Sequence, residues 1–291
     1  MKRNFFKAAV KCILALFCLC GLVFSFFLYE RIHCNHISHK AILCARQRIA
    51  LLSKEDRKAL SVFFHNGISI SSYGHTLLEQ KPMSLLIVLD PDTKESEDPE
   101  IANPYDLTTR GYEVWRKHRD WFPENKYMFV EFVSHIDKKT PLVGLIHVKL
   151  CKATIAKHLS DFQHVIDKPL SPEEIFAILI NPSHEKFDAI INNDFLQGIL
   201  YGYGRNNAYL YDQKIRSKLS HFLAKRYALD RYIRLGSKIY FLCPSFFCDS
   251  TTEETQNLHR LYDEGCKLLY WTYLGRDFLE TTLAFFYTEV D

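Results

Sequence analysis

An uncharged apolar run near the N-terminus constrains this chain more than any other feature. Residues 12–29 read CILALFCLCGLVFSFFLY and contain no charged side chain. An apolar helix needs about 20 residues to cross the hydrocarbon core of a bilayer, and the length of this run lies within the observed range of about 17–25 residues. The sequence therefore predicts a transmembrane helix at residues 12–29, with residues 1–30 as a signal-anchor segment and residues 31–291 as one soluble domain.

The orientation of this helix follows from the basic residues that flank it. Four of them precede it without an intervening acidic residue, namely Lys2, Arg3, Lys7 and Lys11. The positive-inside rule then places the N-terminus in the cytoplasm and the C-terminal domain in the periplasm or elsewhere outside the cytoplasm. The bias is weakened by basic residues that follow the helix within the range that counts: Arg31, Lys40, Arg46 and Arg48. We predict a single-pass protein of the cell membrane.

A cleaved signal peptide is the main alternative to a permanent membrane helix, because it shares the basic start and the apolar run. Its cleavage site requires small residues at A-x-A spacing, whereas this run continues through Phe26–Tyr29 into Glu30. The pattern therefore favours an uncleaved helix. Lipid attachment at Cys18 or Cys20 stays open, although the residues before both are bulky.

The charge balance of the remaining chain excludes one class of partner. Residues 1–30 contain four basic residues and one acidic residue of the chain's 37 and 34, so residues 31–291 are formally neutral. Most nucleic-acid binding requires a basic patch or stripe. We therefore expect no nucleic acid among the partners. The apolar content of 47% suffices for a packed core in a domain of this length.

Cysteine usage leaves the redox state of the domain open. The chain has nine cysteines. Six of them lie outside the apolar run: Cys34, Cys44, Cys151, Cys243, Cys248 and Cys266. In an exported domain they could form disulfides, with Cys243 and Cys248 as a pair close in sequence, but spacing does not fix the pairing. Buried free thiols are an equally good interpretation.

Apolar periodicity and capping signals divide the domain into helices and strands. Helices are expected at residues 40–64 in two pieces with Ser53 as the second N-cap and Gly67 as the stop, at 107–121, at 153–165, from Ser171 onward, across most of 184–224, and at 253–273. Strands are expected at residues 84–89, 127–134, 142–150, 238–243 and 283–290. Residues 90–104 are expected to form an acidic, proline-rich loop.

The order of these elements predicts the fold class. A charged turn separates the strands at 127–134 and 142–150, which is typical of an antiparallel hairpin. Ser171, Pro172 and Glu174 together form a strong helix start with a capping box. Helices and strands are mixed without a regular βαβ rhythm. We predict one α+β domain with a mixed or antiparallel sheet packed by helices.

Two stretches of the domain resemble segments of a bacterial protein family. They read SYGHTLLEQKPMSL at Ser72–Leu85 and LQGILYGYGRNNAYLYDQK at Leu196–Lys214. Both are similar to segments of uncharacterised, membrane-anchored proteins of intracellular bacteria of the chlamydial and legionella type. Gly74 departs from the family pattern, which has Tyr-x-Thr-Leu before Lys-Pro. The resemblance spans residues 60–215 and implies an envelope or host-facing location without a known activity.

Glycine is unusually dense in the segment GILYGYGRNNA, and each glycine weakens a helix by about 1 kcal/mol relative to alanine. Gly198 and Gly202 are expected on one helical face, where they would let another backbone approach closely. A functional interpretation places Arg205, Asn206 and Asn207 around a pocket that the glycines open. A phosphate-binding loop is disfavoured, because the required lysine pattern is missing.

A cluster of metal-binding residue types follows the predicted membrane helix at His33, Cys34, His36 and His39. Their donor atoms suit zinc or copper. His33 and His39 would point about 120° apart on one helix, which does not close a tetrahedral site. We interpret the cluster as polar residues of the membrane interface and predict no metal and no other cofactor.

His147 and Cys151 are expected on one face of the strand at 142–150, so a thiol nucleophile with a base is conceivable. Residues four apart along a strand are separated by about 13 Å, which excludes direct contact between them. We keep His147 only as a residue of a ligand-binding site.

These features favour a binding or scaffold module over an enzyme. We predict an envelope protein that is held in the membrane by residues 12–29 and binds a protein partner or a small ligand. The alternative is a membrane-tethered hydrolase that uses a pocket near Arg205–Asn207 or His147. Convergence of these polar side chains in one concave site would favour the enzyme.

We expect the chain to behave as an integral membrane protein. The helix at residues 12–29 should hold it in the bilayer when alkaline carbonate removes peripheral proteins. Membrane fractionation measures this, and alkaline phosphatase fused to the C-terminus measures the topology. Release by carbonate would contradict membrane integration. An inactive phosphatase, together with an active cytoplasmic reporter at the same position, would contradict the predicted topology.

Overall fold

The computed structural model describes residues 37–88, 99–123, 125–133, 141–213, 220–221, 226–232, 238–242 and 244–288. Contacts divide the chain into two units, residues 1–36 and residues 37–291, and every described residue belongs to the second. The predicted membrane helix at residues 12–29 lies outside the described residues. No helix in the described part is long and apolar enough to cross a bilayer.

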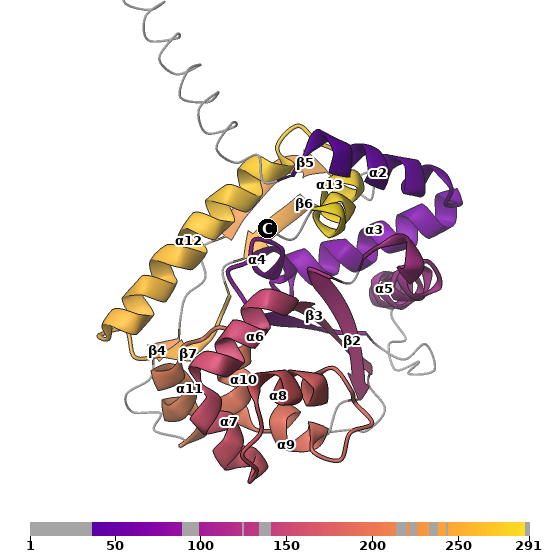
Figure 1. Ribbon diagram of the computed structural model, residues 1–291. Coiled ribbons are helices and arrows are strands. Elements are labelled where there is room, and N and C mark those ends of the chain that lie inside the picture. Colours follow the sequence, from indigo (N-terminus) through magenta and orange to yellow (C-terminus); the bar gives the residue numbers. More distant parts are fainter. Residues whose placement is uncertain are drawn as a thin grey trace, which may run out of the picture. The chain divides into compact units, whose positions relative to one another are not determined.

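A three-stranded antiparallel sheet lies at the centre of this unit (Figure 1). Its strands are β1 (Met83–Ile87), β2 (Tyr127–Val133) and β3 (Pro141–His147), in the order β1-β3-β2. Leu145 of the central strand lies opposite Ser84 on one side and Phe129 on the other. The predicted hairpin and the predicted first strand are therefore confirmed.

Side chains on the two faces of the sheet enter two different hydrophobic cores. Val143 and Leu145 of β3 belong to the first core, whereas Ile146 belongs to the second and Leu142 packs against it. Because successive side chains of a strand point to opposite faces, an apolar residue at every position indicates burial on both sides. The sheet is thus a middle layer with helices on each face.

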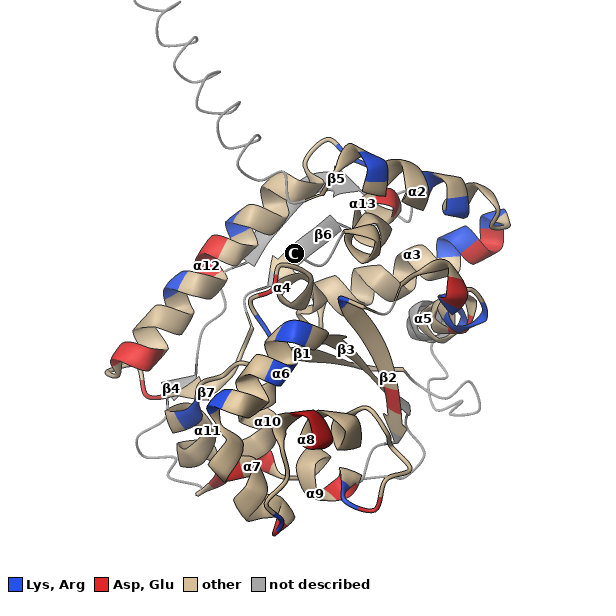
Figure 2. Ribbon diagram, in the orientation of Figure 1, with Lys and Arg blue, Asp and Glu red and all other residues tan. Residues whose placement is uncertain are grey.

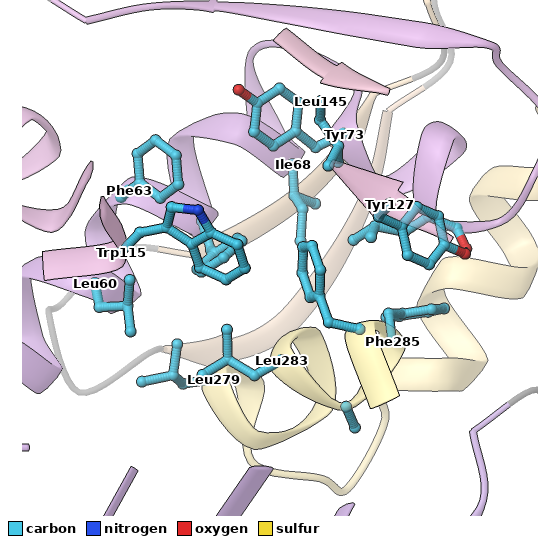
Figure 3. Packing of buried hydrophobic residues seen from close by; sticks show 14 of the residues in the cluster. Leu60, Phe63, Ile68, Tyr73, Trp115, Tyr127, Leu145, Leu279, Leu283 and Phe285 are labelled. Carbon is cyan, nitrogen blue, oxygen red and sulfur yellow. The ribbon is translucent and has the colours of Figure 1, made fainter. Parts of the chain in front are cut away.

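The first core is rich in aromatic rings and is covered by four main helices: α2 (His39–Ala50), α3 (Lys54–Ser69), α5 (Pro99–Lys117) and α13 (Phe278–Ala284). Figure 3 shows Phe63, Trp115 and Phe285 among the packed side chains. The centres of the Trp115 and Phe129 rings lie 4.7 Å apart in an edge-to-face arrangement, a geometry that aromatic pairs favour. Gly111 allows α5 to approach the Ala59 carbonyl of α3.

Six short helices cover the opposite face of the sheet and form the second core: α6 (Val148–Lys157), α7 (Leu159–Ile166), α8 (Pro172–Leu179), α9 (Phe187–Ile191), α10 (Asp194–Leu200) and α11 (Arg205–Asp212). The start of α8 is the predicted capping box, since Ser171 accepts from the Glu174 amide and the Glu174 carboxylate accepts from the Ser171 amide.

The longest helix within the described residues, α12 (Glu253–Tyr273), has the predicted bounds and runs along one side of the unit (Figure 1). Basic and acidic residues alternate along it (Figure 2). It contacts the short helix α4 (Tyr73–Leu77) and two minor strands, β5 (Arg226–Tyr232) and β6 (Lys238–Leu242). The remaining elements are the strands β4 (Ser220–His221) and β7 (Phe247–Cys248), which pair with each other, and the 3-10 helices η1 (Arg119–Trp121) and η3 (Phe285–Tyr287).

Four predicted boundaries were wrong for local reasons. The strand predicted at 142–150 ends at His147, whose ring caps α6, and the helix predicted at 153–165 is broken into α6 and α7 at His158. The loop predicted at 90–104 gives way to α5 at Pro99, since proline is favoured in the first turn of a helix. Helix α3 continues past Gly67 to Ser69.

The strand predicted at 283–290 was also wrong, because this segment is the end of α13 followed by η3. Asp277 caps α13 by accepting from the Glu280 amide at 2.9 Å. Leu279, Leu283 and Phe286 then fall at helical spacing and enter the first core. A run of large apolar residues at both helical and strand positions hid this periodicity.

Candidate functional site

Arg205 and Asn206, two of the predicted site residues, form the first turn of α11. The Glu254 carboxylate of α12 accepts from both of their backbone amides, at 3.0 Å each. A carboxylate is favoured there because the first amides of a helix have no partner within it. The Arg205 guanidinium donates to Asp161 in two hydrogen bonds of 2.7 Å, and the Asn206 side chain is exposed. The Arg205 side chain thus joins α11 to α7, and the backbone amides of Arg205 and Asn206 join α11 to α12.

Asn207 is buried and uses its amide within the fold. Its Nδ2 donates to the Tyr203 carbonyl and to Thr255 Oγ1, both at 2.9 Å. Its Oδ1 accepts from the Asp249 amide at 3.0 Å. The side chain therefore ties α11 to α12 and to the chain before it, although Asn207 also lines a cavity.

His147 lies away from this segment, at the start of α6. Its Nδ1 accepts from the Leu150 amide at 3.0 Å, and its Nε2 lies 3.6 Å from the Glu79 carboxylate, too far for a hydrogen bond. Burial lowers the pKa of the His147 ring, so the ring is neutral near pH 7. Of the described cavities, none is lined by His147 together with Arg205, Asn206 or Asn207.

The glycines of this segment have different roles from one another. Gly198 confirms the packing expectation, because a Cβ there would lie 2.6 Å from the Ala208 Cβ of α11. Gly202 does not share its helical face, since α10 ends at Leu200. Gly202 and Gly204 have φ of 73° and 87°, a region that glycine adopts without strain. They form the turn between α10 and α11 and thereby fix the direction of Tyr201 and Tyr203.

The two stretches with the family resemblance meet in the fold at Lys81 and Tyr203. The Lys81 amino group lies 5.4 Å from the centre of the Tyr203 ring, a distance typical of a cation–π contact. Helix α12 holds the two stretches together, because the Tyr262 hydroxyl donates to the Gly202 carbonyl at 2.6 Å. His75, at the other end of the first stretch, has its Nε2 3.6 Å from the Cys266 thiol of the same helix.

A cavity of about 510 Å³ opens where these stretches meet. Polar side chains on its wall are Asn66, Ser71, Ser72, Lys81, Thr108, Tyr201, Tyr203 and Ser245, and apolar ones are Ile70, Leu85, Leu86 and Ile87. Ile70 and Ile87 are 69% and 58% exposed, so the apolar part of the wall reaches the protein surface. The volume is in the range of sites that bind small molecules.

Lys81 is the distinctive residue of this cavity. It is only 2% exposed, and among the described residues no carboxylate lies within ion-pair distance of its amino group. Desolvation lowers the pKa of Lys81 to about 7, because an ammonium group loses its hydration on burial. Lysine is rarely buried without a partner, which makes this amine a candidate functional group.

Two tyrosines complete the polar end of the cavity. Burial raises the pKa of Tyr203 to about 12 and that of Tyr201 further, so both phenols are neutral near pH 7. The Tyr201 hydroxyl is buried and meets no hydrogen-bonding partner among the described residues. Both rings also line a second cavity of about 260 Å³, walled by Tyr211, Phe246 and Phe247. The larger cavity is therefore lined by one residue with a buried amine and by one with a phenol that has no partner among the described residues.

Sequence reasoning missed Lys81, Tyr201 and Tyr203. It took the glycines of GILYGYG as the unusual residues and passed over the tyrosines between them. No local pattern singles out Lys81, because Glu79, Gln80 and Lys81 together form a polar stretch between Leu78 and Pro82.

No group of three metal-ligating side chains is present within the described part of the chain. Most of the histidine cluster after the predicted membrane helix lies outside that part, at residues 33–36. Of the cysteines that the structure describes, Cys44 and Cys151 are free thiols. Cys243 lies outside the described residues, so its pairing with Cys248 stays an alternative from sequence. Burial raises the pKa of Cys151 to about 12, which excludes an activated thiolate there.

We expect the Asn207→Ala variant to lose about 2 kcal/mol of unfolding free energy, because the Asp249 amide and the Thr255 hydroxyl each lose a buried hydrogen bond to Asn207. Asn206→Ala is the matched control, since the Asn206 side chain is exposed and only its backbone is bonded. Urea unfolding of both variants measures the difference. Equal stability of the two would show that the Asn207 amide is not a structural link.

We expect Lys81→Met to change how stability depends on pH. The unfolded chain holds a proton on Lys81 up to a pKa of 10.5, whereas the folded chain loses it at about 7. Raising the pH through this window therefore stabilises the wild type relative to Lys81→Met, by up to about 1.4 kcal/mol per pH unit. Below pH 7 the difference should be constant. Unfolding curves at pH 6, 7, 8 and 9 measure it, with Lys58→Met on the exposed face of α3 as control; parallel curves for all three proteins contradict the burial of a neutral amine.

Comparison of the chain with protein-family models, with curated proteins and with solved structures found no match. The resemblance to membrane-anchored proteins of intracellular bacteria accordingly stays a prediction from the residues that carry it. The geometry around Lys81 is the basis for a functional conclusion.

Proposed function

We propose that this chain is a membrane-anchored binding protein whose domain holds a small, mainly apolar ligand in the cavity at Lys81. The single observation that carries the proposal is a buried amino group on a cavity wall without a carboxylate partner among the described residues. Such a group is unfavourable for folding, because the amine is desolvated and no carboxylate among the described residues offsets this cost. A ligand that forms a hydrogen bond or an ion pair with the amine would offset this desolvation cost.

The wall of the cavity indicates the chemistry of the ligand. Lys81 and the Tyr201 hydroxyl are donors, so the ligand should present an oxygen acceptor at the inner end. The exposed Ile70 and Ile87 favour an apolar group at the outer end. An oxygen-bearing head with a short hydrocarbon part therefore fits both ends of the cavity.

The hydrolase alternative receives no support from the residues on which it depended. Asn207 is engaged in structural hydrogen bonds, Arg205 pairs with Asp161, and His147 lies at a different helix start. A scaffold for a protein partner would use an exposed surface instead, whereas Lys81 is enclosed. Location outside the cytoplasm remains part of the proposal, and it rests on the sequence of residues 1–30.

A ligand screen tests the binding proposal. Thermal unfolding of the full-length chain is followed with short-chain carboxylates, aldehydes, ketones and alcohols added one at a time. A compound at 100 times its Kd stabilises the folded state by about 2.7 kcal/mol, which is a readily measured shift in Tm. At least one class should stabilise the wild type and Lys58→Met but leave Lys81→Met unchanged. The proposal fails if none of the four classes shifts the wild type, or if Lys81→Met responds equally.

A further inference from the structure

We propose that Lys81 is a nucleophilic amine that forms a reversible imine with an aldehyde or ketone held in the cavity. This inference rests on the proposed function, because the carbonyl compound is the ligand of the same cavity. It goes further by assigning the ligand class and a covalent step. The cavity wall, the lack of a carboxylate partner among the described residues and the position of Tyr201 on the same wall are the observations that support it.

The backbone around Lys81 holds the amine in place. The amides of Gln80 and Lys81 both donate to the His75 carbonyl, at 2.8 and 3.2 Å. Pro82 follows directly, and its ring restricts the backbone of the residue before it. The lysine stem is buried, so few rotamers remain for the side chain. A nucleophile restricted in this way loses little entropy on reaction.

The described groups around Lys81 do not stabilise the protonated form of its amine. Tyr201 and Tyr203, from the turn after α10, and Tyr262, from α12, are neutral phenols because burial raises the pKa of each. Glu79, which is close in sequence, pairs with Lys126 at 2.8 Å and not with Lys81. Because burial lowers the pKa of Lys81 to about 7 and none of the described carboxylates pairs with it, a substantial fraction of the amine is unprotonated near pH 7. Only that form is nucleophilic.

The Tyr201 hydroxyl is suited to the oxygen of the carbonyl group. It is buried, lacks a partner among the described residues, and belongs to a residue on the same cavity wall as Lys81. A buried donor without an acceptor is unfavourable by about 1–3 kcal/mol, and a bound carbonyl oxygen would supply the acceptor. The hydroxyl thereby acts as a hydrogen-bond donor toward developing negative charge on that oxygen.

The proposed step is balanced without a further reactant. The Lys81 Nζ lone pair forms a bond to the carbonyl carbon, and the carbonyl electrons move to the oxygen, which gains the proton lost from nitrogen. The resulting carbinolamine then loses its hydroxyl group with a second proton from nitrogen as water, leaving a C=N bond. Hydrolysis by the same steps in reverse regenerates the amine and the carbonyl compound.

Reductive trapping tests the imine directly. The full-length chain is incubated with butanal and sodium cyanoborohydride at pH 7 and at pH 9, and butylated lysines are quantified by peptide mass spectrometry. At pH 7 the unprotonated fraction of a lysine with pKa near 7 exceeds that of an ordinary lysine on the order of 1,000-fold, so Lys81 should be labelled at least about 100-fold faster than exposed Lys58. Between pH 7 and 9 the unprotonated fraction at Lys81 should rise only about twofold, against about 100-fold for a lysine with the ordinary pKa of about 10.4, so the labelling advantage of Lys81 should shrink as the pH rises.

Each result is decisive within one sample, because Lys58 is an internal control that needs no variant. Preferential butylation of Lys81, with an advantage that shrinks as the pH rises, supports the inference. Labelling of Lys81 no faster than Lys58 overturns it. If butanoate stabilises the wild type but not Lys81→Met while butanal leaves Lys81 unmodified, the imine is wrong and the binding function stands. If no carboxylate, aldehyde, ketone or alcohol acts through Lys81 and no adduct forms, both proposals fail.

Discussion

The Lys81 cavity depends on how α12 contacts two stretches that are far apart in sequence. The Tyr262 hydroxyl bonds the Gly202 carbonyl, and the Glu254 carboxylate caps the helix that follows. On the other stretch, Gly74 and the Gln80 side chain lie against Leu269 and Gly265 of the same helix. Gly74 and Gly265 have no side chain that would block these contacts. Helix α12 therefore holds in place both stretches that line the cavity. The buried amine then has a defined environment, and its low pKa follows from that enclosure.

Local sequence patterns allowed much of the fold to be predicted, and the errors arose where packing between distant segments decides the structure. The bounds of α12 and the Ser171 capping box follow from patterns within a few residues, and both were predicted correctly. The C-terminal segment was misassigned because Phe285 and Phe286 are compatible with either a strand or a helix. Packing against the first core decides for the helix. Tertiary context, which overrides propensity, is absent from a single sequence.

The candidate site was less predictable than the fold. Sequence reasoning selected the segment around Gly198–Asn207, and its tyrosines do line the cavity, but the polar residues chosen there are engaged in structural bonds. Lys81 could not be selected because its significance arises from burial and from the lack of a carboxylate partner within the part of the chain that the structure describes. Both are properties of residues brought together from α4, β1 and the turn after α10. Spacing along the chain does not encode them.

The contact between α2 and α13 has a consequence for biosynthesis. Arg46 of α2 bonds the Glu280 carboxylate of α13 at 2.8 Å, and 234 residues separate the two. The apolar stripe of α2, formed by Ala41, Ala45 and Ile49, enters the first core that α13 completes. During translation α2 is therefore made first among the described helices and waits longest for its partner. Until the last helix leaves the ribosome, this stripe is open to chaperones and proteases.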